Sequence, residues 1–300
     1  MRYVETEVDR APLPSAYNRT PRHLGLADED TTLPYAEYFR PSPRPKQEHV
    51  AAVLAGGQVP AELGYGVDEV ADRLARPGHE AVETGWTRLR SGQIFVAVHT
   101  AMPGVSAAMW DWWFGWHSRE TSRYKLWHPT AHQFAALGED RGLLPGLTDR
   151  QKYVGNVSYV DEYIGKRLHR LAIRFVDPER MGISRVSGTL HVCARVTLSA
   201  YPIGIGWLVH QVRPTADGSE MRSRFFLNDV SVLELPSRSF WAALVATSLV
   251  RRGLSAIPAR ITGAAMPSTL GRDMVQHCAT EMNHLAGFLP ELHDRFRELP

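Results

Sequence analysis

Alternating apolar and polar residues predict a series of β-strands in the middle of the chain. Turn-forming pairs such as Asp177-Pro178 and Asp217-Gly218 separate the runs. Strands joined by such tight turns pair antiparallel, because each turn reverses the direction of the chain. The predicted strands are Tyr153–Ile164, Arg167–Val176, Gly188–Ser199, Ile203–Val212 and Met221–Leu227.

A hairpin and three helical segments flank these strands. Ala81–Ala101 has a strand pattern broken at Ser91-Gly92, which predicts a hairpin. Gly104–His117 is apolar over a wide face and rich in tryptophan, as in a buried helix. Phe240–Val250 is an apolar helical run, and a long C-terminal helix is predicted within Met266–Arg297.

The first 78 residues have a different character. Many prolines up to about Arg44 disfavour helix and predict an extended arm, and Lys46–Arg76 carries only short helical signals. A segment this small has little core of its own. We therefore predict an N-terminal unit of residues 1–78 that packs on the main domain, residues 79–300, or on a second subunit.

The order of elements predicts the fold class. A hairpin, a helix, an antiparallel run and a long last helix are typical of an α+β, helix-grip (START-like) domain. In such a domain a curved antiparallel sheet wraps around the C-terminal helix and leaves a deep cavity between them. Ligands bind in that cavity.

Candidate metal ligands lie on the C-terminal helix. His277 and Glu281 are four residues apart, so their side chains share one helix face and can converge on one cation. His284 lies one turn further on. The alternative is a surface helix in which the His-Glu pair adds a few tenths of a kcal/mol.

Further polar side chains come from the loop and strand segments. In Arg123–His132, Pro129 disfavours helix through His128, so we expect His128 and His132 in a loop at the cavity mouth or at the start of a helix. Asp161 and Glu162 are neighbours in a strand, so one of them must face inward. His132, Glu162, His277 and Glu281 could then meet at one point, and His210 is a strand residue that can face the same cavity.

Composition narrows the class of ligand. The 300 residues include 34 cationic and 32 anionic side chains, for a net charge of +2, which indicates neither nucleic acid nor an acidic membrane as partner. We expect a small, mostly uncharged ligand. The absence of an apolar leader and of a long apolar run predicts a soluble cytoplasmic protein, in which Cys193 and Cys278 are buried free thiols.

Three blocks carry a family resemblance. Residues 112–117 (Trp-Trp-Phe-Gly-Trp-His), 123–132 (Arg-Tyr-Lys-Leu-Trp-His-Pro-Thr-Ala-His) and 277–284 (His-Cys-Ala-Thr-Glu-Met-Asn-His) resemble signature blocks of the 2,4-diacetylphloroglucinol hydrolases and phloretin hydrolase. The resemblance covers about residues 80 to 297. It implies a zinc hydrolase that removes an acyl group from an aromatic ring carbon. The N-terminal unit of this chain resembles the family's dimerisation domain in place and size, which implies a homodimer.

The resemblance also assigns roles to residues. It implies that Zn²⁺ is held by two His and two Glu, and that a Tyr and a His face the substrate. Phe225 stands near the family's second pocket tyrosine, and Gln133 is the nearest candidate for its pocket amide, so substrate preference is expected to differ. The implied metal ligands are His132, Glu162, His277 and Glu281, and the implied substrate-facing residues are Tyr124 and His210.

Other interpretations stay open on the sequence alone. His128, His284 or Asp161 can replace an assigned ligand, and manganese or iron accepts the same nitrogen and oxygen donors as zinc. The same fold also suits a carrier of apolar ligands without enzymatic activity, or a metal-free aromatic polyketide cyclase. Neither the G-x-S-x-G motif of serine hydrolases nor the H-E-x-x-H motif of zinc proteases occurs.

Overall fold

A single curved sheet organises the molecule. The computed structural model describes residues 1–233 and 269–298, so the expected helix Phe240–Val250 lies outside the described residues. The eight strands follow the order β1-β2-β8-β7-β6-β5-β4-β3, with every neighbouring pair antiparallel. They are β1 Gly85–Arg88, β2 Ile94–Pro103, β3 His132–Leu137, β4 Val157–Ile164, β5 Arg167–Val176, β6 Leu190–Leu198, β7 Ile203–Thr215 and β8 Gly218–Val232.

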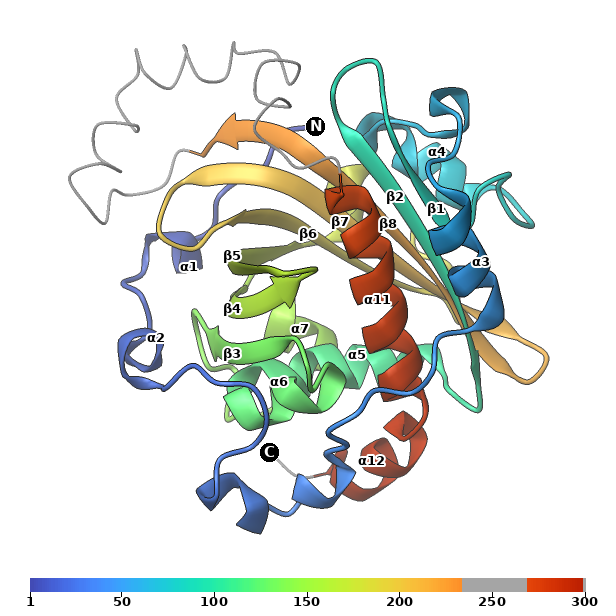
Figure 1. Cartoon of the computed structure of the whole chain (residues 1–300). Helices are drawn as coiled ribbons and strands as arrows, with labels where there is room; N and C mark the ends of the chain where they lie inside the picture. Colours follow the sequence, from blue (N-terminus) through green and yellow to red (C-terminus); the bar gives the residue numbers. More distant parts are fainter. Residues whose placement is uncertain (234–268, 299–300) are drawn as a thin grey trace.

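Helices lie on both faces of this sheet. Helices α5, α6 and α11 pack on the side toward which the sheet curves (Figure 1), whereas α4 packs with Phe95 and α1 with Tyr159 on the opposite side. The α+β class, the hairpin and the antiparallel run are thus confirmed, and the long C-terminal helix is found as α11. The helices are α1 Glu7–Arg10, α2 Ser15–Arg19, α3 Glu48–Gly56, α4 Val70–Ala75, α5 Ala107–Trp116, α6 Thr121–Trp127, α7 Asp149–Tyr153, α11 Leu270–Ala286 and α12 Leu289–Phe296.

Strand alternation separates the two faces of the sheet. On β2, Val96 and Val98 belong to the main hydrophobic core together with Met274 and Met282 of α11. The intervening Ala97, together with Phe95, belongs to a second cluster on the other face. Figure 1 shows the sheet curving around the side that carries α11, which we call the concave face; the opposite face is the convex face.

Close packing fixes α11 on the concave face. A Cβ at Gly271 would lie 2.6 Å from Cδ1 of Trp86 on β1, so the helix start can rest on the indole only without a side chain. Val275 and Cys278 of the same helix are fully buried. Both cysteines are free and buried, as expected.

The segment from 121 to 137 differs from our expectation. Helix α6 runs to Trp127, where Pro129 forbids further helix as predicted, and residues 128–131 form a turn that includes His128. At His132, however, a strand begins instead of a loop. His132 is the first residue of β3 and pairs with Glu162 on β4. This strand was not predicted because β3 is buried on both faces, so apolar and polar residues do not alternate along it.

The first 78 residues pack along the main domain. The predicted extended arm is wrong in part, because the short helices α1 and α2 interrupt it. Tyr17 lies edge-on to Tyr159 of β4, and Tyr35 contacts Trp116 of α5, so the arm shares the cores of the main domain. The boundary at residue 78 stays a prediction.

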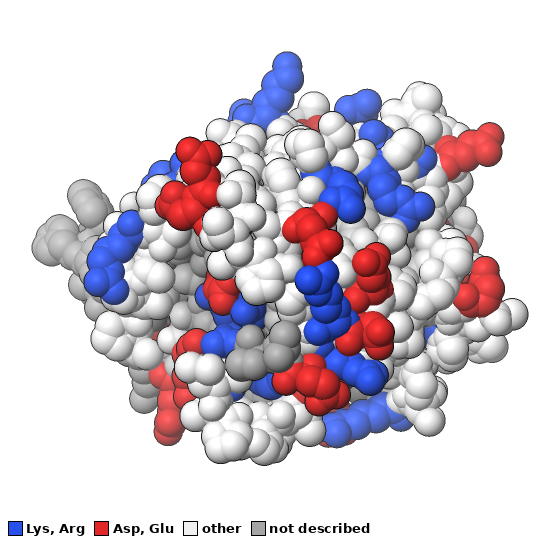
Figure 2. All heavy atoms as spheres, turned by 90° about the horizontal axis from the view of Figure 1, so that it is seen from below, with Lys and Arg blue, Asp and Glu red and all other residues white. Residues whose placement is uncertain are grey.

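The surface carries charges of both signs. Figure 2 shows Lys and Arg interspersed with Asp and Glu on one face, without a large patch of a single sign. In the described part of the chain no helix combines the length and apolarity needed to cross a membrane.

Glu83, in the loop before β1, is expected to contribute strongly to stability. It accepts hydrogen bonds from Arg222 and Arg224 of β8, at 2.7 and 2.6 Å, and both arginines are 1% exposed or less. Glu83→Gln would leave two buried cations without their counter-charge, so we expect a loss of about 3 kcal/mol in the free energy of unfolding by urea at pH 7. Glu69→Gln, which removes an exposed partner of Arg73, should cost less than about 1 kcal/mol.

The same contact predicts acid sensitivity. Burial alone would raise the pKa of Glu83, but the hydrogen bonds and charges of Arg222 and Arg224 lower it from 4.5 to about 2. A lowered folded-state pKa gives stability that is complete above the ordinary pKa and disappears as pH falls through the folded value. The difference between wild type and Glu83→Gln should therefore shrink below about pH 4.5; a pH-independent difference would contradict this role.

Candidate active site

A cavity of about 380 Å³ lies between α11 and the concave face of the sheet. Its size suits one small organic molecule. Inward-facing strand residues such as Leu171, Ile173 and Leu208 make most of its wall apolar. Polar side chains gather in one region, where β4, β5, α6 and α11 meet; these are Tyr124, Glu162, His169, His277 and Glu281.

Four side chains converge in this region. Nε2 of His132 lies 3.7 Å from Oε2 of Glu162 and 3.5 Å from Oε2 of Glu281. Nε2 of His277 lies 3.9 and 3.7 Å from the same two oxygens. Ligand atoms around a tetrahedral ion with bonds of about 2.0–2.1 Å are about 3.3 Å apart, so a small inward movement would let all four reach one ion.

His132 has the orientation of a metal ligand. Its Nδ1 donates to the backbone oxygen of Tyr124 at 3.0 Å, which leaves the lone pair on Nε2. That Nε2 is buried and has no hydrogen-bond partner among the described residues. Burial lowers the pKa of both His132 and His277, so both imidazoles are neutral and able to coordinate.

The two carboxylates need a counter-charge. Burial, and then the charge of Glu162, raises the pKa of Glu281 well above its usual value. The hydroxyl of Tyr124 donates to Glu162 and its ring stacks on His132, with centroids 3.8 Å apart. Two neutral imidazoles and two buried carboxylates fit a divalent cation, because nitrogen and oxygen donors satisfy it and it neutralises both charges.

The structure separates the competing ligand candidates. Asp161 faces the convex side, where Arg22 contacts it at 3.2 Å. His284 accepts a hydrogen bond from the backbone N–H of Arg44 at 3.2 Å, away from the cluster. His128, the residue after α6, is buried against His277 with ring centroids 4.9 Å apart. Only His128 of these three therefore adjoins the cluster.

The substrate-facing candidates lie at different distances from the cluster. His210 of β7 lines the cavity; its Nδ1 is 2.8 Å from Oγ of Ser223, and it stacks on Phe114. Burial lowers the pKa of His210 to about 3, so the ring is neutral. Phe225 lines the cavity beside it, whereas Gln133 is not one of the lining residues.

Two lining histidines had no role in the sequence-based hypothesis. His117, which follows α5, stacks on Tyr124, and burial lowers its pKa to about 4. His169 of β5 pairs with Glu162 in the sheet, and its Nε2 is buried without a hydrogen-bond partner among the described residues. The position of His169 could have been predicted from strand alternation, because His169, Leu171 and Ile173 are two residues apart and line the same cavity.

Comparison with known proteins places these features in a family. The chain is 29% identical to the 2,4-diacetylphloroglucinol hydrolase of Pseudomonas protegens over 273 residues, which cover 88% of this chain and 84% of the relative. It is 27% identical to the phloretin hydrolase of Eubacterium ramulus, with 90% and 93% covered. A norcoclaurine synthase structure from Thalictrum flavum matches 62% of this chain and 97% of its own, at 12% identity and a TM-score of 0.28.

The family match extends over most of the chain. The sequence model described as "DAPG hydrolase PhiG domain", DAPG being 2,4-diacetylphloroglucinol, matches residues 53–294. This range begins before the residue 80 expected from the three sequence blocks, so it includes α4 and the C-terminal end of α3. The family resemblance is thereby confirmed: the chain belongs to the DAPG hydrolase family.

Proposed function

We propose that this chain is a zinc-dependent hydrolase that cleaves the C–C bond between an acyl group and a polyhydroxylated aromatic ring, on a helix-grip fold. The supporting observation is the convergence of His132, Glu162, His277 and Glu281 in the polar region of an apolar cavity. The relatives named as 2,4-diacetylphloroglucinol hydrolase and phloretin hydrolase support the reaction class, since both names denote acylated polyphenols.

The metal site follows from the four converging side chains. His132 and His277 would supply neutral nitrogens, while Glu162 and Glu281 would supply carboxylate oxygens, a donor set that suits Zn²⁺. A bound zinc ion would polarise the acyl carbonyl and lower the pKa of water at the site. Tyr124 would keep Glu162 in place through its hydroxyl hydrogen bond, as supporting residues do around metal ligands.

The ring must leave as a stabilised carbon. In the net reaction the OH of water goes to the acyl carbon and its proton goes to the ring carbon. A ring hydroxyl that shifts to its keto form makes the leaving carbon enolate-like, so a group that handles the hydroxyl proton assists cleavage. Neutral His210 would accept or return the proton of the ring hydroxyl. Tyr124 is a weak acid here, because burial and the charge of Glu162 raise its pKa.

Metal removal tests the proposal. Chelated, dialysed protein should lose about 10²-fold or more of its deacylation rate on a panel of acylphloroglucinols, and added Zn²⁺ should restore it. The readout is carboxylic acid and deacylated phenol released in equal amounts. An unchanged deacylation rate without bound metal would contradict the role of zinc, and tight ligand binding without turnover would favour the carrier.

The oligomer and the compartment stay predictions. The expected homodimer can be checked by light scattering of the purified full chain. The cytoplasmic location can be checked by fractionating cells that express it.

A further inference from the structure

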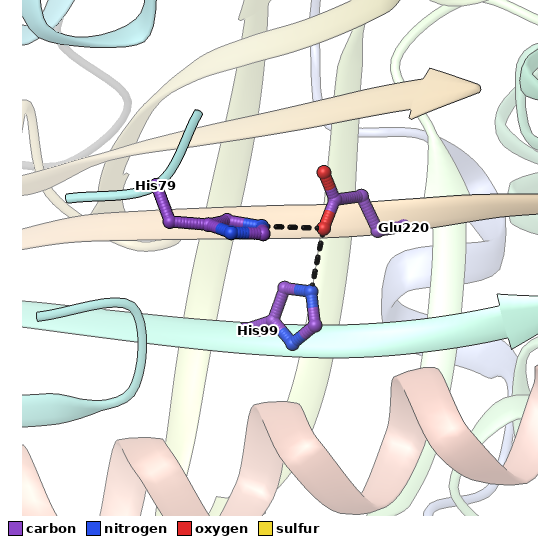
Figure 3. A group of neighbouring side chains, drawn as sticks. All are labelled: His79, His99 and Glu220. Carbon is purple, nitrogen blue, oxygen red and sulfur yellow. Dashed lines mark hydrogen bonds and ion pairs between the residues drawn. The ribbon is translucent and has the colours of Figure 1, made fainter. Parts of the chain in front are cut away.

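A second group of side chains that could hold a metal ion lies on the convex face of the sheet. It comprises His79 in the loop after α4, His99 on β2 and Glu220 on β8 (Figure 3). These residues come from three distant parts of the sequence. None of them lines the cavity between α11 and the concave face.

The sheet register brings two of the three together. Ala101 of β2 pairs with Glu220, and His99 pairs with Arg222, so His99 and Glu220 are diagonal neighbours. His99 shares its side of β2 with Phe95, whose cluster is on the convex face. The group is therefore separate from the proposed active site, with the sheet between them.

The three ligand atoms already point at one position. Figure 3 shows both imidazoles directed at one carboxylate oxygen: Nε2 of His79 is 2.8 Å and Nε2 of His99 is 2.7 Å from Oε2 of Glu220. All three ligand atoms lie within 4.8 Å of one another. Both imidazoles thus share one carboxylate oxygen as acceptor.

We propose that His79, His99 and Glu220 form a second divalent-cation site, suited to Zn²⁺. Two imidazoles and a carboxylate are a donor set that zinc accepts, with the fourth position left for water. The nitrogen-to-oxygen separations must widen to about 3.3 Å around the ion. His79 can supply this movement, because its side chain is 53% exposed and it comes from a loop.

The charges around His79, His99 and Glu220 determine how strongly these side chains would bind a cation. Arg213 contacts the other oxygen of Glu220, so part of the carboxylate charge is already neutralised. Nε2 of His49 donates to the backbone carbonyl of His99 at 3.1 Å, and the two rings lie with their centroids 5.8 Å apart. The convex site should accordingly bind zinc more weakly than the four-ligand site.

An ion at this position would connect separate parts of the fold. His79 belongs to the loop that joins the N-terminal unit to β1, whereas His99 and Glu220 belong to the paired strands β2 and β8. Zinc would cross-link this loop to the sheet. Binding to the folded state alone then raises the unfolding temperature.

Metal counting tests the convex site. Full-length protein equilibrated with micromolar Zn²⁺ should hold two equivalents by mass spectrometry, and His79→Ala should hold one. Glu220→Gln should also hold one, while His23→Ala, which removes an imidazole from the arm, should keep two. Micromolar Zn²⁺ should raise the unfolding temperature of His277→Ala by a few degrees, and should not do so once His79→Ala is added.

The two metal proposals fail separately in this experiment. His277→Ala should retain the equivalent that His79→Ala loses, even if the active site binds no metal. If His79→Ala and wild-type protein hold the same amount of zinc, the proposed convex site is wrong. Zinc uptake at His79 that requires millimolar concentrations would overturn it as well, since that is the behaviour of an isolated surface histidine.

Discussion

Replacing His277 by alanine should lower kcat/KM for acylphloroglucinol cleavage by about 10³-fold or more. The imidazole is buried in α11 and its Nε2 is directed toward both Glu162 and Glu281. Its removal leaves three donors, so the ion is lost or misplaced, and with it several kcal/mol of transition-state stabilisation. The active-site equivalent of zinc should disappear together with the activity.

The matched control is Gln276→Ala on the same helix. Gln276 is adjacent in sequence but its side chain bonds to Thr280 of its own helix, outside the cavity. We expect this variant to retain its metal and to keep activity within about threefold, because no donor changes. A His277→Ala enzyme with wild-type kcat/KM and intact circular dichroism would refute the assignment of the metal centre.

The C-terminal helix shows what local sequence can predict. His277 and Glu281 needed only helical spacing to be placed together. Strand parity required one of Asp161 and Glu162 to face inward, and the family resemblance selected Glu162, which lines the cavity. Each rule depends on residues within a few positions in sequence. The corresponding parts of the site were therefore predictable.

His132 shows where such rules end. Its position depends on pairing between β3 and β4, where the register shifts between His132 and Phe134, and β3 has no alternation to reveal it. The sequence placed the residue in the site through family resemblance while misassigning its secondary structure. A register shift is set by tertiary packing, so local pattern cannot supply it.

The convex group is a stronger case of the same limit. His99 and Glu220 meet because β2 pairs with β8, which lies more than a hundred residues later in the sequence. Neither residue is part of a local motif. Chemistry assembled by long-range strand pairing becomes visible only in the folded chain.

His210 should be required for turnover but not for the metal. His210→Phe keeps an aromatic ring beside Phe114 and Phe225 yet removes the nitrogen that we propose contacts the ring hydroxyl, so kcat should fall by about 10²–10⁴-fold. Zinc content should match wild type, because His210 is separate from the four converging side chains. Steady-state kinetics with metal analysis of the same sample measures both.

Ser223→Ala separates positioning from proton handling at His210. The serine hydroxyl contacts Nδ1 of His210 at 2.8 Å and orients the ring, so its loss should cost about 10-fold in kcat and less than the loss of the ring itself. If His210→Phe and Ser223→Ala both leave kcat unchanged and raise only KM, His210 merely lines the cavity. The ring-carbon proton would then have to come from a group beside the metal cluster, where His169 and His117 are the remaining neutral imidazoles in the cavity wall.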